Sequence, residues 1–543
     1  MKKNLLRKFL LMGFIFAGAI SSVDGQTEPN FLWAKKAGGI KTDEAWCISV
    51  DASGNSYIGG SFQDTATFGN ATLINNKPSD DDAFIAKLDA NGNFLWAIKA
   101  GGNSDDGCTA ISTDAAGNCY AAGFFKSDTL YIGNYKIKNN GGGRSIFITK
   151  IDASGTIKWV KTGSAWDANA VYTTASGISY ITGEYSGSIE FDRFIPSSGT
   201  RDIFILKMDA DGNYISTKTA GSMGDDNAYG IYVDSEMNWA ITGYYRAGTV
   251  KFYKRGGGTI DLAPTGSYDG FAAKLDTAGY CFWAINFSSK RYTDVRGQCI
   301  TGDAAGNTYI AGVFQDTMTI GTIKLVSPRK FGWNVYDAFV AKIDAGGNVL
   351  WAKHIDEDAP EMQPYSHGLY TDVLGNSYIA GYNYIMKIAA NGDSLWTKQI
   401  VNNGGAGLGA KCRGIDFDAN GNCYVAGQFY GNTTFGNISL APYGDRDAFV
   451  TKLDNTGNEV GIKDAVKNNF SIYPNPASNL VTLTNLSNNT SVNITDLAGK
   501  QVYSTIANTT ELSINTGGFA NGVYLVNVST AGNMVNKKLI INH

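Results

Sequence analysis

A pattern that recurs along the chain constrains the fold more than any other feature of the sequence. Its clearest copy reads Asp51-Ala52-Ser53-Gly54-Asn55-Ser56-Tyr57-Ile58-Gly59-Gly60, followed by Asp82-Ala83-Phe84-Ile85-Ala86-Lys87-Leu88-Asp89 and then Gly92-Asn93-Phe94-Leu95-Trp96. The turn position of the first block recurs at Gly54, Gly117, Gly177, Met237, Gly306, Gly375 and Gly421. Self-similarity of this kind indicates one supersecondary unit stacked many times.

The spacing of the copies identifies the repeated unit. Successive turn positions lie 63, 60, 60, 69, 69 and 46 residues apart. The shortest spacing is the size of a four-stranded propeller blade. In the first copy we expect four strands, a to d, over residues 46–51, 56–62, 83–89 and 94–99, because alternating apolar stretches are separated by Gly-Asn turns. The sequence therefore predicts an all-β chain with a seven-bladed β-propeller, with six or eight blades as the alternatives if one of the degraded copies, at Gly177 and Met237, is misread.

The two ends of the repeat region predict how the ring closes. Residues 31–35, Phe-Leu-Trp-Ala-Lys, match a strand d that has no strands a to c before it. The last copy supplies strands a to c and then fades, with Val460 where a tryptophan is expected. We therefore expect the N-terminal strand to complete the last blade within a propeller domain over residues 26–460, because ring closure removes free sheet edges.

The repeated motifs carry a family resemblance. The blocks Trp-Ala-Lys, Asp-x-x-Gly-Asn-x-Tyr-x-x-Gly and Asp-x-Phe-x-x-Lys-x-Asp resemble the bacterial β-propeller repeats grouped as SBBP, over about residues 30–460. The resemblance implies the propeller fold. It implies no particular activity, because propellers host unrelated functions.

The N-terminus predicts export. Residues 1–25 combine a basic start, an apolar core and small residues before Gln26, which is typical of a cleaved signal peptide. The alternative is a retained membrane anchor, but the apolar run is short for a span, and no later segment is long and apolar enough to cross a membrane. Removing residues 1–25 changes the formal net charge from −4 to −7, which disfavours nucleic acid as a partner.

The cysteines do not point to a metal or redox motif. The chain has seven, and none stands in a Cys-x-x-Cys pair. Several occupy equivalent places in different copies, as Cys119 and Cys423 do after Gly-Asn. We interpret them as small buried core residues, with one or two disulfides as the alternative that an exported location permits.

A different pattern begins after a linker at residues 461–468. Residues 469–543 contain short alternating strands and predict a small Ig-like β-sandwich. Four motifs mark this tail: Tyr-Pro-Asn-Pro with Pro474, Asn475 and Pro476; Asp-x-x-Gly-Lys with Asp496, Gly499 and Lys500; Gly-x-Tyr with Gly522 and Tyr524; and the basic pair Lys537 and Lys538.

This tail resembles the C-terminal sorting domain of the type IX secretion system. The resemblance implies that the type IX secretion machinery is a partner of the chain. It also implies passage through the outer membrane, and a mature protein that is secreted or attached to the outer-membrane surface after signal and tail cleavage. The alternative is an ordinary accessory Ig-like domain.

The strand order divides the propeller into two faces. The a–b and c–d turns share one face, which we call the turn face, and the b–c insertions of about 20 residues share the other with the d–a links. We call the latter the link face, and expect its long loops to contact the ligand.

Acidic residues recur in the d–a links of the link face at Asp43, Asp106, Asp167, Asp226 and Asp294. They suggest a site for a divalent cation such as calcium or for a polyhydroxyl ligand. The alternative is that each aspartate orders its own link through backbone hydrogen bonds.

The sixth copy contains a second candidate site. It lacks the insertion and instead gathers His354, Asp356, Asp358 and His367, residue types that bind metals. Their spacing matches no known ligand motif, and the alternative is a polar loop that fills the space of the missing insertion.

The function predicted from these features is binding. No nucleophile elbow, phosphate loop or zinc-protease motif is present. The sequence favours a secreted or surface-displayed adhesion protein with an extracellular glycan or protein ligand. The alternative is a secreted enzyme that processes glycans or proteins with carboxylates of the link face.

Overall fold

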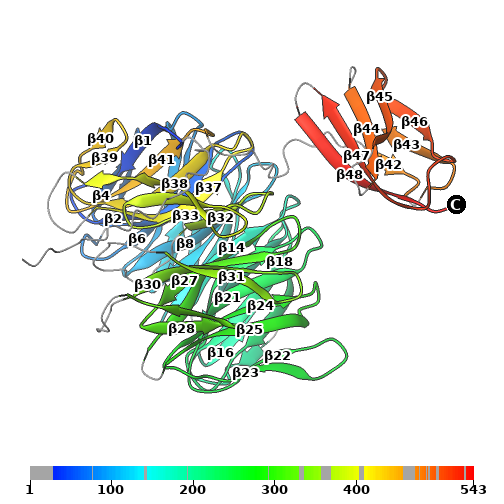
Figure 1. Cartoon of the computed structure of the whole chain (residues 1–543). Helices are drawn as coiled ribbons and strands as arrows, with labels where there is room; N and C mark the ends of the chain where they lie inside the picture. The colour runs from blue at the N-terminus through cyan, green and yellow to red at the C-terminus, as the bar shows by residue number, and fades with distance from the viewer. Residues whose placement is uncertain are drawn as a thin grey trace, which may run out of the picture. The chain divides into compact units, whose positions relative to one another are not determined.

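The repeat forms consecutive four-stranded antiparallel sheets in the computed structural model of the chain (Figure 1). The structure describes residues 28–75, 77–139, 143–191, 194–290, 293–328, 336–355, 368–402, 409–456 and 471–543, the last range without residues 476, 485, 487–489, 497–500 and 531–532. The predicted signal peptide, residues 1–25, lies outside the described residues. The chain separates into two units, Met1–Ile462 and Lys463–His543.

Each sheet of the first unit is named here by its strand a. The β2 sheet contains β2 (Asp43–Val50), β3 (Ser56–Phe62), β6 (Asp82–Leu88) and β7 (Phe94–Gly101). The β8 sheet contains β8 (Asp106–Thr113), β9 (Cys119–Phe125), β12 (Ser145–Ile151) and β13 (Ile157–Gly163). The β14 sheet contains β14 (Asp167–Thr173), β15 (Ser179–Tyr185), β18 (Asp202–Met208) and β19 (Tyr214–Ala220). The β20 sheet contains β20 (Asn227–Val233), β21 (Trp239–Tyr245), β24 (Asp269–Leu275) and β25 (Cys281–Ser289).

The later sheets repeat the same antiparallel order. The β26 sheet contains β26 (Val295–Gly302), β27 (Thr308–Phe314), β30 (Asp337–Ile343) and β31 (Val349–Ile355). The β32 sheet contains β32 (Gly368–Thr371), β33 (Ser377–Ala380), β34 (Tyr384–Ile388) and β35 (Ser394–Gln399). The β37 sheet contains β37 (Ala410–Phe417), β38 (Cys423–Phe429), β41 (Asp447–Leu453) and, as its outer strand, β1 (Phe31–Ala37).

The first and last sheets are in contact. Strand β1 pairs antiparallel with β41, with Ala34 opposite Thr451. Two hydrogen bonds also join the β2 sheet directly to the β37 sheet. The Val50 amide of β2 donates to Asp416 Oδ2 of β37 at 2.9 Å, and the Tyr424 hydroxyl of β38 donates to the Gly54 carbonyl at 2.9 Å. The sheets therefore form a closed, propeller-like fold in which the N-terminal strand completes the sheet formed by the C-terminal repeat.

The aspartate of the repeated turn organises that turn. Asp51 Oδ1 accepts hydrogen bonds from the Ser53 and Asn55 amides at 3.0 and 2.9 Å, and Oδ2 accepts from Asn55 Nδ2 at 2.8 Å. Gly54 has a φ of +79°, a conformation that disfavours residues with a Cβ. Equivalent carboxylates make the same bonds at Asp114, Asp234, Asp303, Asp372 and Asp418.

The other motif residues join neighbouring sheets. The Tyr57 hydroxyl donates to the Gly117 carbonyl of the next sheet at 2.7 Å. Lys87 Nζ and Trp96 Nε1 both donate to the Ala153 carbonyl in the c–d turn of that sheet, at 3.0 and 3.4 Å. Lys150 and Trp159 repeat the arrangement on the Ala210 carbonyl, as Lys342 and Trp351 do on Ala390. The repeat motif therefore encodes contacts between sheets on the turn face.

The glycine that ends the Tyr-x-x-Gly block lies opposite a β-bulge. Strand a shifts register between Ala45 and Cys47, and Gly60 of strand b faces Ala45. A Cβ on Gly60 would lie 1.9 Å from the Glu44 carbonyl oxygen. The same separation recurs at Gly123, Gly183, Gly243 and Gly427. The glycine is therefore required by the close approach of two backbones at the bulge.

The b–c insertions are β-hairpins, so the expectation of long loops on the link face is wrong. They are β4 (Thr65–Phe68) with β5 (Ala71–Ile74), β10 (Thr129–Ile132) with β11 (Tyr135–Lys138), β16 (Ser188–Glu190) with β17 (Phe194–Pro196), β22 (Val250–Tyr253) with β23 (Thr259–Leu262), β28 (Thr317–Ile320) with β29 (Ile323–Val326), and β39 (Thr433–Phe435) with β40 (Ile438–Leu440). Strand β39 also pairs with β36 (Val401–Asn402). Alternating burial along β4 and the positive φ of Gly69 after it explain the hairpin.

Two of the hairpins pair with the outer strand of the preceding sheet. Strand β10 pairs with β7, and β28 pairs with β25, which extends each of those sheets to six strands. The pairing covers hydrogen-bonding groups at an exposed sheet edge. The insertions therefore complete the scaffold as well as contributing to its surface.

The second unit contains two sheets. One contains β42 (Ser471–Tyr473), β43 (Leu480–Thr484) and β46 (Glu511–Asn515), and the other contains β45 (Gln501–Ala507), β44 (Thr490–Asp496), β47 (Gly522–Thr530) and β48 (Asn533–Ile541). Val481 and Ile514 of the first sheet join Val492, Val526 and Leu539 of the second in one buried cluster. The tail is thus a β-sandwich. In the part of the chain that the structure describes, no helix is long and apolar enough to cross a membrane.

Candidate ligand-binding face

The five link aspartates occupy three different positions in the sheet register. Asp43 and Asp106 lie opposite the last residue of strand b, as the pairing Asp43–Phe62 shows. Asp226 precedes Asn227, which pairs with Tyr244, so it corresponds to the same position. Asp167 lies one residue further along strand a, and Asp294 one residue earlier. Successive side chains of a strand point to opposite sides, so the five do not form a single ring of equivalent carboxylates.

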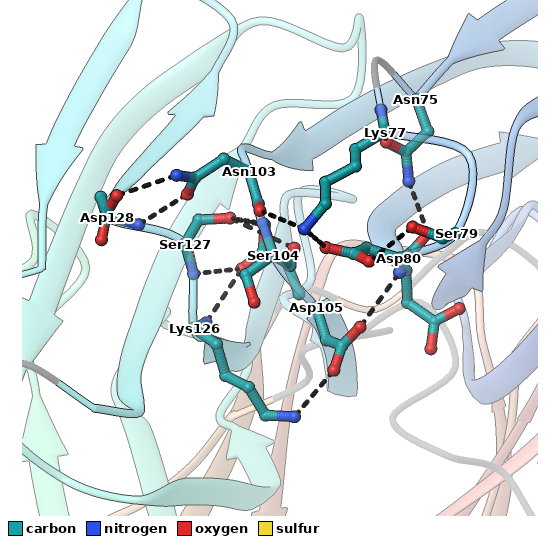
Figure 2. Close-up of polar contacts among 12 residues, drawn as sticks. Asn75, Lys77, Ser79, Asp80, Asn103, Ser104, Asp105, Lys126, Ser127 and Asp128 are labelled. Atoms are coloured by element: carbon teal, nitrogen blue, oxygen red, sulfur yellow. Dashed lines mark hydrogen bonds and ion pairs between the residues drawn. The ribbon is translucent and has the colours of Figure 1, made fainter.

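The aspartates at the first of these positions accept hydrogen bonds from backbone amides close to the ends of strands b and d. Asp106 accepts hydrogen bonds from the Lys126 and Ser127 amides at 3.0 and 3.2 Å and from the Ser127 hydroxyl at 2.6 Å. Figure 2 shows the polar network around this link, in which Asp105 pairs with Lys126 at 2.8 Å and Asn103 donates to Asp128 at 2.8 Å. Asp106 therefore orders the start of the b–c insertion directly, and its own d–a link only through Ser127, which hydrogen-bonds to the Ser104 backbone.

Asp43 and Asp226 have similar surroundings. Asp226 accepts from the Ser222 hydroxyl at 3.0 Å and the Arg246 amide at 3.2 Å, and Asp43 accepts from the Gly39 amide at 2.6 Å. Burial raises the pKa of Asp43 to about 8 and that of Asp226 to about 7, and the pKa of Asp106 is likewise raised to about 7. Their role as ligand-binding residues remains a prediction.

Several other carboxylates of this face pair with arginines. Arg144 pairs with Asp167 at 2.6 Å, and Arg201 pairs with Glu184 at 2.8 Å. The others join Arg246 to Asp225, Arg296 to Asp294, and Arg413 and Arg446 to Glu44. Ion pairs of this kind hold each guanidinium group in a defined plane.

Aromatic rings lie beneath most of these guanidinium groups. Arg144 stands 3.5 Å from the ring centroid of Phe124, Arg201 4.8 Å from Trp166, and Arg296 4.9 Å from Tyr268. Arg246 also lies over Tyr268, and Arg446 over Tyr430. We call the combined set the arginine rim; it consists of Arg144, Arg201, Arg246, Arg296, Arg413 and Arg446 with their carboxylate and aromatic partners. Each guanidinium group of the rim has one face against an aromatic ring or a carboxylate beside it. The N–H groups at its edge can donate hydrogen bonds to a ligand.

The rim was not predicted from the sequence, although a signal for it exists. The residue directly before strand c is Arg144, Arg201 and Arg446 in three copies, and Tyr268 and Tyr336 in two others. Tyr336 donates its hydroxyl to Asp294 at 3.0 Å, so both residue types at this position join the rim. The sequence pattern did not reveal this position because it lies one residue before the repeated block Asp-x-Phe-x-x-Lys-x-Asp that forms strand c.

Two rim carboxylates lie directly opposite each other. Asp167 of β14 pairs in register with Glu184 of β15. Burial raises the pKa of Asp167 to about 6 and that of Glu184 to about 7, although Arg144 and Arg201 favour the charged forms. The geometry thus places a protonatable pair next to two fixed cations.

This pair predicts a pH-dependent stability. A carboxyl whose pKa is raised by folding stabilises the protein fully below its unfolded pKa, about 4.3, and loses that contribution as the pH rises through about 7. We expect wild type to lose about 2 kcal/mol of unfolding free energy between pH 4.5 and 7.5 relative to Glu184→Gln. Urea denaturation of both proteins across this range measures the difference. If the difference in unfolding free energy between wild type and Glu184→Gln stays constant with pH, the pKa of Glu184 is not raised by folding.

A partly open cavity of about 300 Å³ adjoins the rim between the β8 and β14 sheets. Its lining residues are Lys126, Asp128, Asn139, Gly143, Arg144 and Trp166. Asn139 Nδ2 donates to the Gly143 carbonyl at 2.7 Å, and Asn139 Oδ1 accepts from Ser145 at 3.0 Å, so the amide is held in place.

The histidine cluster of the sixth copy is described only in part. His354 Nε2 lies 3.4 Å from Asp337 Oδ2, and its ring packs edge-on against Phe314. Asp356, Asp358 and His367 lie outside the described residues. Within the described ranges, no group of three or more His, Cys, Asp or Glu residues could hold a metal ion. A metal site here, or a bound calcium ion on the link face, stays a prediction.

All seven cysteines are free thiols and are buried or half-buried. Cys47 and Cys108 belong to neighbouring strands a, and both sulfur atoms lie within 3.0 Å of the point where a Cβ on Gly59 would stand. Their placement accords with the interpretation as small core residues.

The motif residues of the tail include contacts that hold the sandwich together. Asn475 Oδ1 accepts from the Ile540 amide at 2.8 Å, which ties the Tyr-Pro-Asn-Pro segment to β48. The Tyr524 hydroxyl donates to the Ala520 carbonyl at 2.9 Å, and Asp496 pairs in register with Tyr524. Pro474 follows β42, Gly522 begins β47, and Lys537 and Lys538 belong to β48, with Lys537 exposed. Pro476, Gly499 and Lys500 lie outside the described residues.

Comparison with known proteins identifies the tail. Residues 471–542 match the family described as the secretion system C-terminal sorting domain. The chain is 24% identical over 400 residues to an uncharacterized WD repeat-containing protein, L264, of Acanthamoeba polyphaga mimivirus. It is 23% identical over 409 residues to the regulatory protein FlaEY of Caulobacter vibrioides. These matches cover 60% and 63% of this chain but only 28% and 39% of the relatives.

Two solved structures are also similar. The Dos1 propeller has a TM-score of 0.40 at 8% identity, covering 78% of this chain and 95% of that one. PorZ of Porphyromonas gingivalis, described as a surface component of the type IX secretion system, has a TM-score of 0.19 at 14% identity, covering 94% of this chain and 100% of that one. The fold assignment rests on the sheet topology, and the tail assignment on its family match. The chain is a β-propeller protein with a type IX secretion C-terminal sorting domain, which directs it to the cell surface or the extracellular space.

Proposed function

We propose that this protein is an extracellular binding or adhesion protein whose arginine rim contacts a glycan or protein ligand. One observation carries the proposal. The position before strand c holds arginine in three copies and tyrosine in two, and these side chains gather on the link face with their carboxylate partners. Arginine and tyrosine are the residue types most enriched at energetically important contact positions of interfaces.

The two faces of the propeller differ in how their polar groups are used. On the turn face, the aspartate, tyrosine, lysine and tryptophan of the repeat bind their own turn or the next sheet. On the link face, Arg144, Arg296 and Arg446 each have a buried Nε–H with no hydrogen-bond partner among the described residues. A buried donor without a partner costs free energy, which a ligand or bound water can recover.

The proposal includes the finer architecture that the sequence predicts. The propeller has seven blades of SBBP type within residues 26–460, and the sorting domain occupies residues 469–543. The strand pairing β1–β41 and the repeated turn motif support this architecture. After export, cleavage of residues 1–25 and of the tail by the secretion machinery leaves the propeller outside the cell.

A binding screen tests the proposed function. The mature propeller is applied to an array of bacterial and host glycans and of extracellular matrix proteins, beside the variant Arg296→Ala. We expect at least one retained ligand, and at least tenfold weaker binding in the variant because Arg296 contacts both Tyr244 and Tyr268. The matched control is Tyr253→Ala, which removes an exposed aromatic residue of the β22–β23 hairpin. Equal binding by wild type and Arg296→Ala would overturn the role of the rim.

A second candidate function is favoured by one specific observation. The Asp167–Glu184 pair, with raised pKa values beside two arginines, could serve as a general acid and its partner in a hydrolase. Release of oligosaccharide or peptide from an array ligand, abolished by Glu184→Gln, would favour the enzyme. Retention of the ligand without turnover favours binding. Asp106 and Asp226 are poorer choices for this test because their oxygens already accept hydrogen bonds from nearby backbone amides and serine hydroxyls.

A further inference from the structure

The cavity beside Trp166 combines an aromatic surface with polar groups. The Trp166 indole is half-buried, lines the cavity, and is held in place by the Arg201 guanidinium 4.8 Å from its ring centroid. Arg201 in turn donates to Glu184 Oε1 at 2.8 Å. An indole fixed in this way offers a flat apolar surface at little cost in side-chain entropy.

The cations that line the cavity are already paired with carboxylates. Lys126 pairs with Asp105 at 2.8 Å, and Arg144 pairs with Asp167 at 2.6 Å, so each cation already has a carboxylate partner. Asp128 adds a negative charge and accepts a hydrogen bond from Asn103 (Figure 2). The lining therefore has no excess positive charge with which to bind a phosphate, a sulfate or a carboxylate. A further buried charge would be costly to desolvate.

The same groups offer both donors and acceptors. Lys126 is a donor and Asp128 is an acceptor, both exposed, and the Arg144 guanidinium group, a donor, also lines the cavity. A sugar hydroxyl donates and accepts at once, so it can satisfy a mixed set of this kind. The axial C–H groups on one side of a pyranose ring can pack on the electron-rich face of an indole.

We propose that this cavity binds an uncharged pyranose unit of an extracellular glycan, with the sugar ring on Trp166 and its hydroxyls on Lys126, Asp128 and Arg144. A volume of about 300 Å³ lies at the small end of ligand pockets and suits one or two sugar units. The inference rests on the proposed function, because it names the ligand class for one part of the arginine rim.

Saturation-transfer NMR on the full mature chain tests the inference. The probes are the methyl pyranosides of glucose, galactose, mannose and N-acetylglucosamine, with methyl glucuronide as the charged counterpart. We expect transfer to at least one neutral pyranoside, a loss of at least tenfold in affinity for Trp166→Ala, and partial retention for Trp166→Phe. Lys126→Met removes a donor at a partly exposed site and should weaken binding without unfolding the protein. Tyr253→Ala is the control and should bind as wild type does.

The outcomes separate this inference from the proposed function. If the protein binds methyl glucuronide more tightly than the neutral pyranosides, and this binding weakens steeply with salt, the proposal that the ligand is uncharged would be wrong. Binding that survives in both Trp166→Ala and Lys126→Met would overturn the site. Retention of an array ligand that depends on Arg296, together with no response to any pyranoside, would overturn the inference and leave the proposed function standing. Absence of both responses would overturn both.

Discussion

Deletion of residues 469–543 is expected to leave the propeller in the periplasm. The signal peptide predicted at residues 1–25 would suffice to cross the inner membrane, but the sorting domain that matches residues 471–542 is the element that directs passage through the outer membrane. The deletion falls outside the closed sheets, so the propeller should still fold. Fractionation of cells and protease treatment of intact cells measure the location. Normal surface display of the truncated chain would refute the assignment of the tail.

A matched pair of point variants makes this test independent of deletion. Val526 is fully buried in the core of the sandwich, whereas the neighbouring Leu525 is 40% exposed on the opposite side of β47. A carboxylate at position 526 must enter an apolar core without a partner, which costs several kcal/mol. We expect Val526→Asp to block export as the deletion does, and Leu525→Asp to be exported normally. Equal export of the two variants would show that sorting does not need the folded sandwich.

Substitution of a strand-b glycine should have the largest effect on propeller stability. A Cβ on Gly123 would lie 1.9 Å from the Gly107 carbonyl oxygen and 2.8 Å from the Phe147 ring. The backbones of β8 and β9 cannot move apart at the bulge without breaking the pairing between these strands. We therefore expect Gly123→Ala to lower the free energy of unfolding by about 3 kcal/mol. Thermal and urea denaturation of the mature chain measure the change.

Gly143→Ala is the control for this prediction. Gly143 belongs to the same β8 sheet region, directly before Arg144 and β12, and a Cβ there would meet nothing within 4 Å. Its substitution should change stability by less than about 0.5 kcal/mol. If Gly123→Ala proves as stable as Gly143→Ala, the bulge tolerates a side chain and the repeated glycine needs another explanation.

Much of the fold follows from local sequence signals. The Asp51–Asn55 turn is specified by residues within five positions of one another, and the alternation along residues 83–89 marks strand c without reference to the rest of the chain. The all-β, propeller-like fold and the second β-sandwich could therefore be predicted. The hairpin nature of the insertions could also have been predicted, because alternating residues and a Gly turn are present at Thr65 to Asn70.

The site was harder to predict because it depends on register and on contacts between sheets. Link aspartates that look alike in sequence fall at three register positions, and a shift of one residue reverses the direction of the side chain, as for Asp43 and Asp167. The rim joins Arg144 to Asp167 and Arg296 to Tyr244, from different sheets, which no local window contains. The residue position before strand c was the available signal, and its meaning appears only once the copies are aligned by strand.

The pairing of β1 with β41 also sets the order of events during export. Asn30 and Asp454 form reciprocal hydrogen bonds across 424 residues, including Asn30 N to Asp454 Oδ1 at 3.0 Å. The first strand to emerge on the far side of the inner membrane must therefore wait for almost the whole repeat region before it finds its partner. Until then the strand edge of the growing array is open to mispairing with other chains. If residues 1–25 direct export as predicted, we expect the chain to be most prone to aggregation during translocation, when a chaperone that covers unpaired strands would matter most.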